Sequence, residues 1–138
     1  MSAFESVHKL RFGQCDPSGI AYFPAYMDML VGVTEDLFEA IGWAWPKLMQ
    51  ERNISTPTVK LEVTFQHPGF EGDELAMQCS VARIGTSSLD LVHSVTSDQH
   101  LWRAEQRLVA TAANSHRPVP WPGDIRSALK QFQETKDA

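Results

Sequence analysis

The sequence has little of what membrane proteins, nucleic-acid-binding proteins and disulfide-rich proteins require. It contains no run of about 18 apolar residues, the length that a membrane-spanning helix needs. Its lysines and arginines form no cluster and its formal net charge is -5, whereas nucleic-acid binding requires a concentrated basic surface. The two cysteines, Cys15 and Cys79, form no CxxC pair, so neither a disulfide framework nor a zinc site is predicted. We expect no membrane partner and no nucleic-acid partner.

Several short motifs are also missing. The sequence contains no GxSxG, GxGxxG or Walker loop, which argues against serine α/β-hydrolases and the common nucleotide-binding folds. The segment "MSAFESVHKLRF" lacks the apolar core of a signal peptide, and we therefore expect a cytoplasmic protein. The histidines form no HxxxH pair and accompany no acidic cluster, so we expect structural or surface roles and no metal site. They are His8, His67, His93, His100 and His116.

A single domain over residues 1–138 is predicted, because 43% of the residues are hydrophobic and no repeat or long linker divides the chain. Alternation predicts a first strand over residues 4–12, with Phe12 on the same face as Phe4 and Leu10. Apolar residues spaced by three and four predict a helix over 24–41, with Asp28, Glu35 and Glu39 on a different face. Gly32 within it is expected to permit close packing. The Trp-rich segment 42–53 is read as a connector.

Four further segments alternate in the manner of half-buried strands: 56–67, 73–83, 87–97 and 101–113. The links between them are short enough for hairpins, so we predict a meander of four antiparallel strands. Each strand has one apolar face, and the long helix is the element available to cover those faces. The fold class is therefore α+β, with a curved antiparallel sheet wrapped around one long helix.

The stretch "FGQCDPSGIAYFPAY" places Asp16 just before this helix. A carboxylate can attack a carbonyl carbon or activate a water molecule, and the unpaired amides at a helix N-terminus can stabilise the resulting oxyanion. Since Pro24 has no N–H, the amides of Phe23 and Ala25 are the candidates. Gly19 would let the turn approach them without a Cβ in the way. Two other readings stay open: a purely structural Asp-Pro-x-Gly turn, and Cys15 as a nucleophile.

The order of elements and the segment "DPSGIAYFPAY" resemble the hotdog-fold acyl-CoA thioesterases, in particular the 4-hydroxybenzoyl-CoA thioesterase branch. The matching residues are Asp16, Gly19, Ile20, Tyr22 and Tyr26. The resemblance implies a thioesterase that hydrolyses a small or aromatic acyl-CoA, with Asp16 as nucleophile or general base and Phe23 as the oxyanion amide. It also implies that Tyr22 and Tyr26 contact the substrate, and that coenzyme A enters only as part of that substrate, with no cofactor.

The turn "ARIGTSS" corresponds to the place where the similar enzymes hold the nucleotide end of coenzyme A with basic residues. This chain has one basic residue there, and the expected coenzyme A contacts are Arg83, Gly85, Thr86, Ser87 and Ser88. The resemblance implies a homodimer, with a tetramer as the expected assembly, in which two sheets join edge to edge. That arrangement would bring this turn of one chain towards Asp16 of its partner.

Two other functions remain open. One is a non-catalytic module that binds acyl-CoA or acyl-carrier protein on the same fold. The other is a hotdog dehydratase, although the segment "CDPSGIAYF" lacks the paired histidine and acid of that group. The acyl group, and the choice between coenzyme A and acyl-carrier protein, are also open. Glu35 and Glu39 are interpreted as part of a solvated helix face; a role as a helper acid is the alternative.

Overall fold

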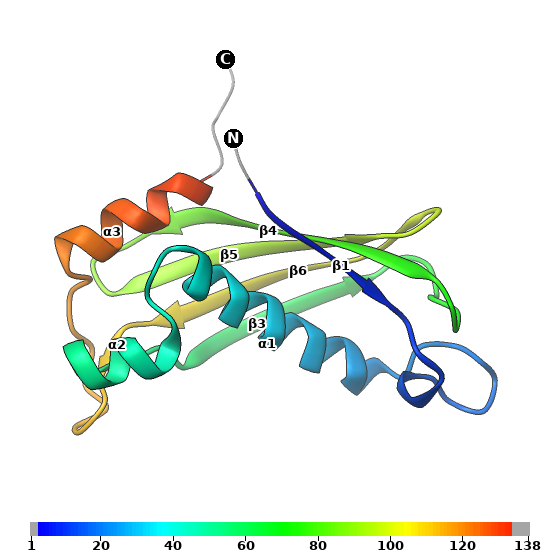
Figure 1. The fold of residues 1–138 in the computed structure, drawn as a ribbon, viewed down its shortest axis with the longest axis horizontal. Helices are drawn as coiled ribbons and strands as arrows, with labels where there is room; N and C mark the ends of the chain where they lie inside the picture. Colours follow the sequence, from blue (N-terminus) through cyan, green and yellow to red (C-terminus); the bar gives the residue numbers. More distant parts are fainter. Residues whose placement is uncertain (1–2, 134–138) are drawn as a thin grey trace, which may run out of the picture.

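The computed structural model describes residues 3–133 and confirms the predicted α+β class. Its main layer is a five-stranded antiparallel sheet with the strand order β1-β4-β5-β6-β3. The strands are β1 (Phe4–Lys9), β3 (Thr58–Phe65), β4 (Glu74–Ile84), β5 (Ser88–Thr96) and β6 (His100–Val109). The helix α1 (Phe23–Ala40) lies across one face of this sheet (Figure 1).

The predicted four-stranded meander is wrong in one connection. Strands β4, β5 and β6 form consecutive hairpins, but β3 pairs with β6 at the sheet edge and not with β4. The link 66–73 is therefore a crossover. Along it, the Gly69 carbonyl accepts a hydrogen bond from the Ala21 amide at 2.9 Å, and Phe70 forms a bridge with Ile20. This crossover runs beside the loop that precedes α1.

Helix α1 buries the face that its periodicity predicts. Leu30, Val33 and Leu37 are buried in the core, whereas Asp28, Glu35 and Glu39 are exposed. The expectation for Gly32 is wrong within this chain, because a Cβ added there would meet no atom within 4 Å. The first strand is also shorter than predicted: Phe12 lies in the 3-10 turn η1 (Phe12–Gln14) and is 81% exposed.

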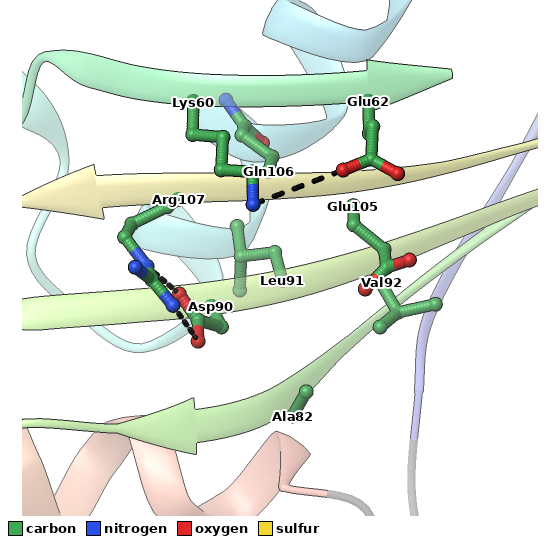
Figure 2. A pocket seen from close by; sticks show the side chains of 9 residues that line it. All are labelled: Lys60, Glu62, Ala82, Asp90, Leu91, Val92, Glu105, Gln106 and Arg107. Carbon is green, nitrogen blue, oxygen red and sulfur yellow. Dashed lines mark hydrogen bonds and ion pairs between the residues drawn. The ribbon is translucent and has the colours of Figure 1, made fainter.

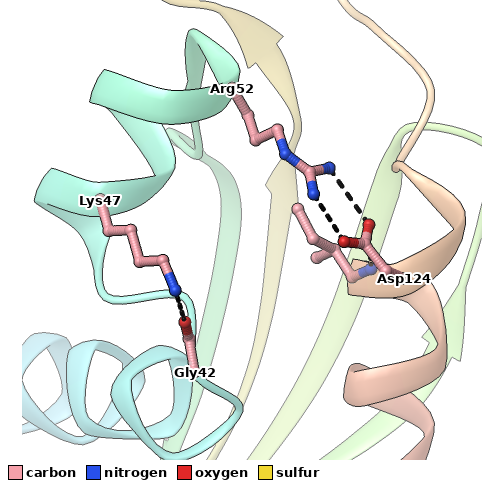
Figure 3. Close-up of polar contacts among 5 residues, drawn as sticks. Gly42, Lys47, Arg52 and Asp124 are labelled. Atoms are coloured by element: carbon pink, nitrogen blue, oxygen red, sulfur yellow. Dashed lines mark hydrogen bonds and ion pairs between the residues drawn. The ribbon is translucent and has the colours of Figure 1, made fainter.

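Two short helices lie at the end of the sheet opposite the start of α1 (Figure 1). The segment expected to be a connector contains α2 (Trp45–Arg52), and α3 (Gly123–Leu129) was not predicted. Arg52 and Asp124 join these helices through two hydrogen bonds of 3.1 and 2.5 Å (Figure 3). The remaining elements are β2 (Ile54–Ser55), β7 (Thr111–Ala112) and η2 (Lys130–Phe132). Within residues 3–133, no helix is long and apolar enough to cross a membrane.

A small polar network lies inside the core between α1 and the sheet. Gln106 contacts Nε2 of His93 at 2.8 Å and the hydroxyl group of Thr34 at 2.9 Å, and its amide nitrogen donates to the Thr58 hydroxyl at 2.9 Å. His93 is only 1% exposed, and burial lowers its pKa. The network thus links the helix to three strands, and it supports a structural role for His93.

Strand β3 is less buried than its alternation predicts. Leu61 and Phe65 are 41% and 48% exposed, although they pair with the core residues Gln106 and Trp102. Val59 is 57% exposed and lies at a shift of the register, between Thr58 and Lys60. The reason is position: β3 is the edge of the sheet, and β6 is its one neighbour in the sheet order. This edge combines free backbone groups with exposed apolar side chains, a combination that proteins usually cover.

Candidate active site

Asp16 lies in a tight turn between η1 and α1. Its backbone carbonyl accepts a hydrogen bond from the Gly19 amide at 2.9 Å. Oδ1 of its carboxylate accepts from the Ser18 amide at 2.8 Å and from the Ser18 hydroxyl. These donations, that of the hydroxyl foremost, hold the pKa of Asp16 below its ordinary value. The carboxylate is therefore ionised at neutral pH, and within residues 3–133 Oδ2 has no hydrogen-bond partner.

Gly19 has a backbone role, but not the one expected. A Cβ at this position would meet no atom within 4 Å, so steric room is not the constraint. Its φ angle is 84°, in the left-handed region that side chains other than that of glycine rarely adopt. The turn from Asp16 to Ile20 can therefore close because residue 19 is glycine.

The two ends of this loop are held together beside the helix start. Cys15 forms an antiparallel bridge with Ala21, and the Tyr22 amide donates to the Gln14 carbonyl at 2.8 Å. These contacts connect the chain just before Asp16 to the chain just before α1. The candidate acid and the helix N-terminus therefore lie at the same end of the molecule (Figure 1).

The structure distinguishes the two candidate oxyanion amides. The Ala25 amide donates to the Tyr22 carbonyl at 2.8 Å and is therefore already satisfied. Phe23 is the first residue of α1, and its amide donates to no acceptor in the described part of the chain. An unpaired amide at a helix N-terminus is suited to developing negative charge. Phe23 therefore remains the candidate and Ala25 does not.

A cavity of about 340 Å³ opens beside this helix start. Its lining is largely apolar and comes from the loop, from the first turn of α1 and from the end of β3 with the crossover that follows. The apolar members include Ile20, Ala21, Phe23, Phe65 and Pro68. Their aromatic rings form a cluster, in which Phe23 meets Phe65 edge-on at 5.9 Å between ring centroids. The cavity has the size and character of a pocket for a small aromatic or aliphatic group.

Tyr26 forms the buried wall of this cavity. Its ring lies 5.2 Å from that of Trp102, and its side chain is 4% exposed. Burial, followed by the charge of Asp73, raises the pKa of Tyr26 to about 12, so the phenol is protonated at neutral pH. Its hydroxyl group has no hydrogen-bond partner in the described structure. Tyr22 is 57% exposed and is not among the residues that line the cavity.

Within one chain, the structure does not bring the predicted coenzyme A turn to Asp16. The turn between β4 and β5 lies at the opposite end of the sheet from the loop of Asp16 (Figure 1). The backbone there is well anchored, since the Trp121 amide donates to the Thr86 carbonyl at 2.9 Å and Arg126 donates to the Gly85 carbonyl at 2.6 Å. Arg126 adds a positive charge to this turn that the sequence did not indicate.

A second cavity, of about 120 Å³, lies on the face of the sheet that points away from α1 (Figure 2). Charged side chains surround it, and Arg107 binds Asp90 through two hydrogen bonds of 2.7 and 3.0 Å. On the other side of the cavity, Nζ of Lys60 lies 3.8 Å from Oε2 of Glu62. Its charges are largely paired with one another, so it has the features of a solvated sheet surface.

Cys15 does not have the environment of an activated nucleophile. Burial, followed by the negative charges of Glu71, Asp16 and Asp73, raises the pKa of its thiol, whereas a reactive cysteine needs a lowered one. Among residues 3–133, no group of three or more histidine, cysteine, aspartate or glutamate side chains is arranged to hold a metal ion.

Sequence reasoning missed two residues at this site, Ser18 and His67. Ser18 could have been found, because an Asp followed two positions later by a serine often forms side-chain hydrogen bonds within a turn. His67 lines the cavity from the crossover after β3. No local pattern indicates this position, because it depends on how β3 and β4 are connected.

Comparison with known proteins assigns a family. A sequence model of the thioesterase-like superfamily matches residues 10–129. The 4-hydroxybenzoyl-CoA thioesterase of Pseudomonas sp. (strain CBS-3) is 30% identical over 90 residues, 64% of each chain. The 1,4-dihydroxy-2-naphthoyl-CoA hydrolase of Acaryochloris marina is 23% identical over 107 residues, 78% of this chain and 75% of that one. A crystal structure of a 4-hydroxybenzoyl-CoA thioesterase mutant with bound 4-hydroxybenzoyl-CoA superposes with a TM-score of 0.87 at 23% identity, covering 94% of this chain and 99% of that one, which shows the hotdog fold.

Proposed function

The chain belongs to the thioesterase-like superfamily, and we propose that it hydrolyses a small or aromatic acyl-CoA thioester to the free acid and coenzyme A. The similar proteins named above are hydrolases of hydroxybenzoyl-CoA and dihydroxynaphthoyl-CoA. The observation that carries the proposal is a free helix N-terminal amide, that of Phe23, on the lining of an apolar cavity, with an ionised carboxylate in the loop that leads into the same helix. Asp16 is not itself among the residues that line the cavity. A planar acyl group fits such a cavity with its carbonyl near the helix start.

In the proposed mechanism, Asp16 acts through Oδ2 while Ser18 holds Oδ1. As a nucleophile, Oδ2 would form a bond to the thioester carbon, and collapse of the tetrahedral adduct would break the carbon–sulfur bond and release the thiolate of coenzyme A. Water would then hydrolyse the resulting anhydride and regenerate Asp16. As a general base, Oδ2 would take a proton from the attacking water. In both routes the oxyanion would accept a hydrogen bond from the Phe23 amide.

The proposed active unit is a homodimer with shared sites. The exposed apolar side chains of Val59, Leu61 and Phe65 on the β3 edge support this proposal, since antiparallel pairing of two such edges would bury them. A second support is that, within one chain, the loop before α1 and the turn between β4 and β5 lie at opposite ends of the sheet (Figure 1). In an edge-to-edge dimer, that turn of one subunit would approach Asp16 of the other and bind the phosphates of coenzyme A through Arg83, backbone amides and hydroxyl groups.

A thiol-release assay on a panel of acyl-CoA thioesters tests the proposal directly. We expect turnover of aromatic substrates by the wild-type protein, and turnover slower by about 100-fold or more in Asp16→Asn. Asp28→Asn, which changes an exposed acid on α1, is the matched control and should keep wild-type activity. A protein that binds acyl-CoA but releases no thiol from any of the thioesters would instead be a binding module.

A further inference from the structure

The cavity beside the start of α1 is largely apolar, so its few polar atoms are informative. Three of its nine lining residues have side chains that can form hydrogen bonds: Tyr26, Gln66 and His67. Oε1 of Gln66 is already paired with Nδ1 of His100. The Tyr26 hydroxyl is buried without a partner, and Nε2 of His67 has no partner among the described residues. Nε2 of His67 is therefore a polar atom on the lining that no hydrogen bond of the described fold uses.

The tautomer of the neutral His67 ring follows from its one hydrogen bond. Nδ1 lies 2.9 Å from the backbone carbonyl oxygen of His100. Because a carbonyl oxygen can only accept, Nδ1 carries the proton, and Nε2 of the neutral ring is then an acceptor. Hydrogen bonds also anchor the backbone that carries this ring, because the amides of Gln66 and His67 both donate to the Leu101 carbonyl, at 2.8 and 3.2 Å.

We propose that His67 is a specificity-determining residue that accepts, through Nε2, a hydrogen bond from a hydroxyl group on the acyl part of the substrate. The inference rests on the proposed function, because it concerns the same cavity. An acyl group without a hydroxyl would displace water from Nε2 and give no donor in return, whereas a hydroxylated ring would replace that hydrogen bond.

Two substitutions test the roles of the two ring nitrogen atoms of His67 separately. In His67→Asn, the side-chain amide can occupy the position of Nδ1 and keep the bond to the His100 carbonyl, but nothing replaces Nε2. In His67→Gln, the longer side chain can place its amide oxygen near the position of Nε2. The side chain is exposed on one side, so both variants should fold, which circular dichroism can verify.

The experiment measures kcat/KM for benzoyl-CoA and for its 2-, 3- and 4-hydroxy derivatives in the three proteins. For the wild-type protein we expect about tenfold selectivity for the best hydroxylated substrate over benzoyl-CoA, as one neutral hydrogen bond provides. In His67→Asn the ratio should fall to about one. His67→Gln should keep most of the selectivity. Equal ratios in all three proteins, or a parallel loss for every substrate, would overturn the inference.

A binding measurement makes this test independent of hydrolysis. Phenacyl-CoA and hydroxyphenacyl-CoA are thioethers that cannot be hydrolysed, and calorimetry gives their Kd ratio in the same three proteins. If the Kd ratio changes in His67→Asn but the protein releases thiol from no thioester, the proposed hydrolase activity is wrong and the inference about His67 stands. If thiol is released but the kcat/KM ratio and the Kd ratio are the same in His67→Asn as in the wild-type protein, only the inference about His67 is wrong. Absence of binding by the wild-type protein to both thioethers also overturns it.

Discussion

The Tyr26 hydroxyl lies against the Cα of Gly69, so closely that a Cβ on residue 69 would overlap the phenolic oxygen. Gly69 is buried, and an added Cβ would also approach Leu10 at 3.3 Å and Leu101 at 3.4 Å. A helix residue and a crossover residue therefore share one tight contact on the wall of the cavity.

This contact predicts that Gly69→Ala destabilises the protein by about 1–3 kcal/mol, as overpacking of a core does. Adding Tyr26→Phe should recover much of that loss, because it removes the oxygen atom that the new methyl group overlaps. Urea unfolding of the wild-type protein, both single variants and the double variant gives the interaction energy. If the effects of the two substitutions on the free energy of unfolding simply add, the contact between Tyr26 and Gly69 does not exist as described.

For Asp16→Asn we predict that kcat falls about 100- to 10,000-fold, while the affinity for a non-hydrolysable acyl-CoA analogue persists. The amide keeps the shape of the carboxylate but neither attacks a carbonyl nor accepts a proton well. Steady-state kinetics and calorimetry measure the two effects. A variant with the wild-type rate would exclude Asp16 from the chemistry.

The Ser18 hydroxyl predicts a pH effect. Its hydrogen bond stabilises the carboxylate form and is the main cause that lowers the pKa of Asp16, so Ser18→Ala should raise that pKa. Since the ionised form is the reactive one, the acidic limb of the kcat/KM profile should move to higher pH. Ser18→Thr keeps the hydroxyl and should retain the wild-type profile. If the Ala and Thr profiles coincide, the hydroxyl has no such role.

Shared sites predict complementation between two inactive chains. One chain carries Asp16→Asn and the other carries Arg83→Glu with Thr86→Glu, which alter exposed positions at the end of β4 and in the turn that follows it. Ser88 is less suitable for substitution, because it is half-buried and its carbonyl accepts from the Trp121 indole at 3.0 Å. In a mixed dimer, one site receives both defects and the other neither.

Random refolding of equal amounts should therefore restore about a quarter of the wild-type activity, since half of the dimers are mixed and each has one intact site. Native mass spectrometry would verify that the mixed dimers form. Mixed dimers as inactive as both parents would show that each site lies within one chain.

His93 predicts a loss of stability in acid. Its pKa is lowered in the folded protein by burial, whereas in the unfolded chain it has its ordinary value of about 6.5. Above that ordinary value both states are neutral and His93 contributes no pH dependence. Below it the unfolded chain binds a proton that the folded protein does not, so the free energy of unfolding falls by up to about 1.4 kcal/mol per pH unit, until the folded pKa is reached.

Thermal unfolding between pH 7.5 and 5.0 measures this slope. His93→Gln should have a shallower slope than the wild-type protein, whatever its absolute stability. His116→Asn alters an exposed histidine whose φ of 61° asparagine also tolerates, and it should keep the wild-type slope. Identical slopes in all three proteins would show that His93 does not titrate differently in the two states.

Much of the fold follows from local patterns in the sequence. The spacing of Leu30, Val33 and Leu37 predicts α1 to within one residue at each end, because one face of a helix must repeat every three or four residues. Alternation finds the strands but does not determine their partners, so the pairing of β3 with β6 was missed. Helix α2 is too short for its apolar period to be clear, although Pro46 and Asn53 mark its ends.

The candidate site was predicted where it depends on adjacent residues and missed where it depends on topology. Asp16, Gly19 and Phe23 lie within one short stretch, so turn and helix chemistry could identify them. Which amide is free required the structure, because the Ala25 bond to Tyr22 is a matter of local geometry. His67 reaches the cavity only because the crossover from β3 to β4 passes the start of α1.

The strand order also constrains how the chain can assemble during synthesis. Strand β1 is made first but pairs with β4, and β3 pairs with β6, so neither edge of the sheet can form until a distant segment has left the ribosome. The apolar face of α1 has no complete sheet to cover it during that interval. The hairpins of β4, β5 and β6 are the local part of the topology, and they come late in the chain. Until β6 emerges, the nascent chain therefore exposes an amphipathic helix and an unpaired strand that a holding chaperone could bind.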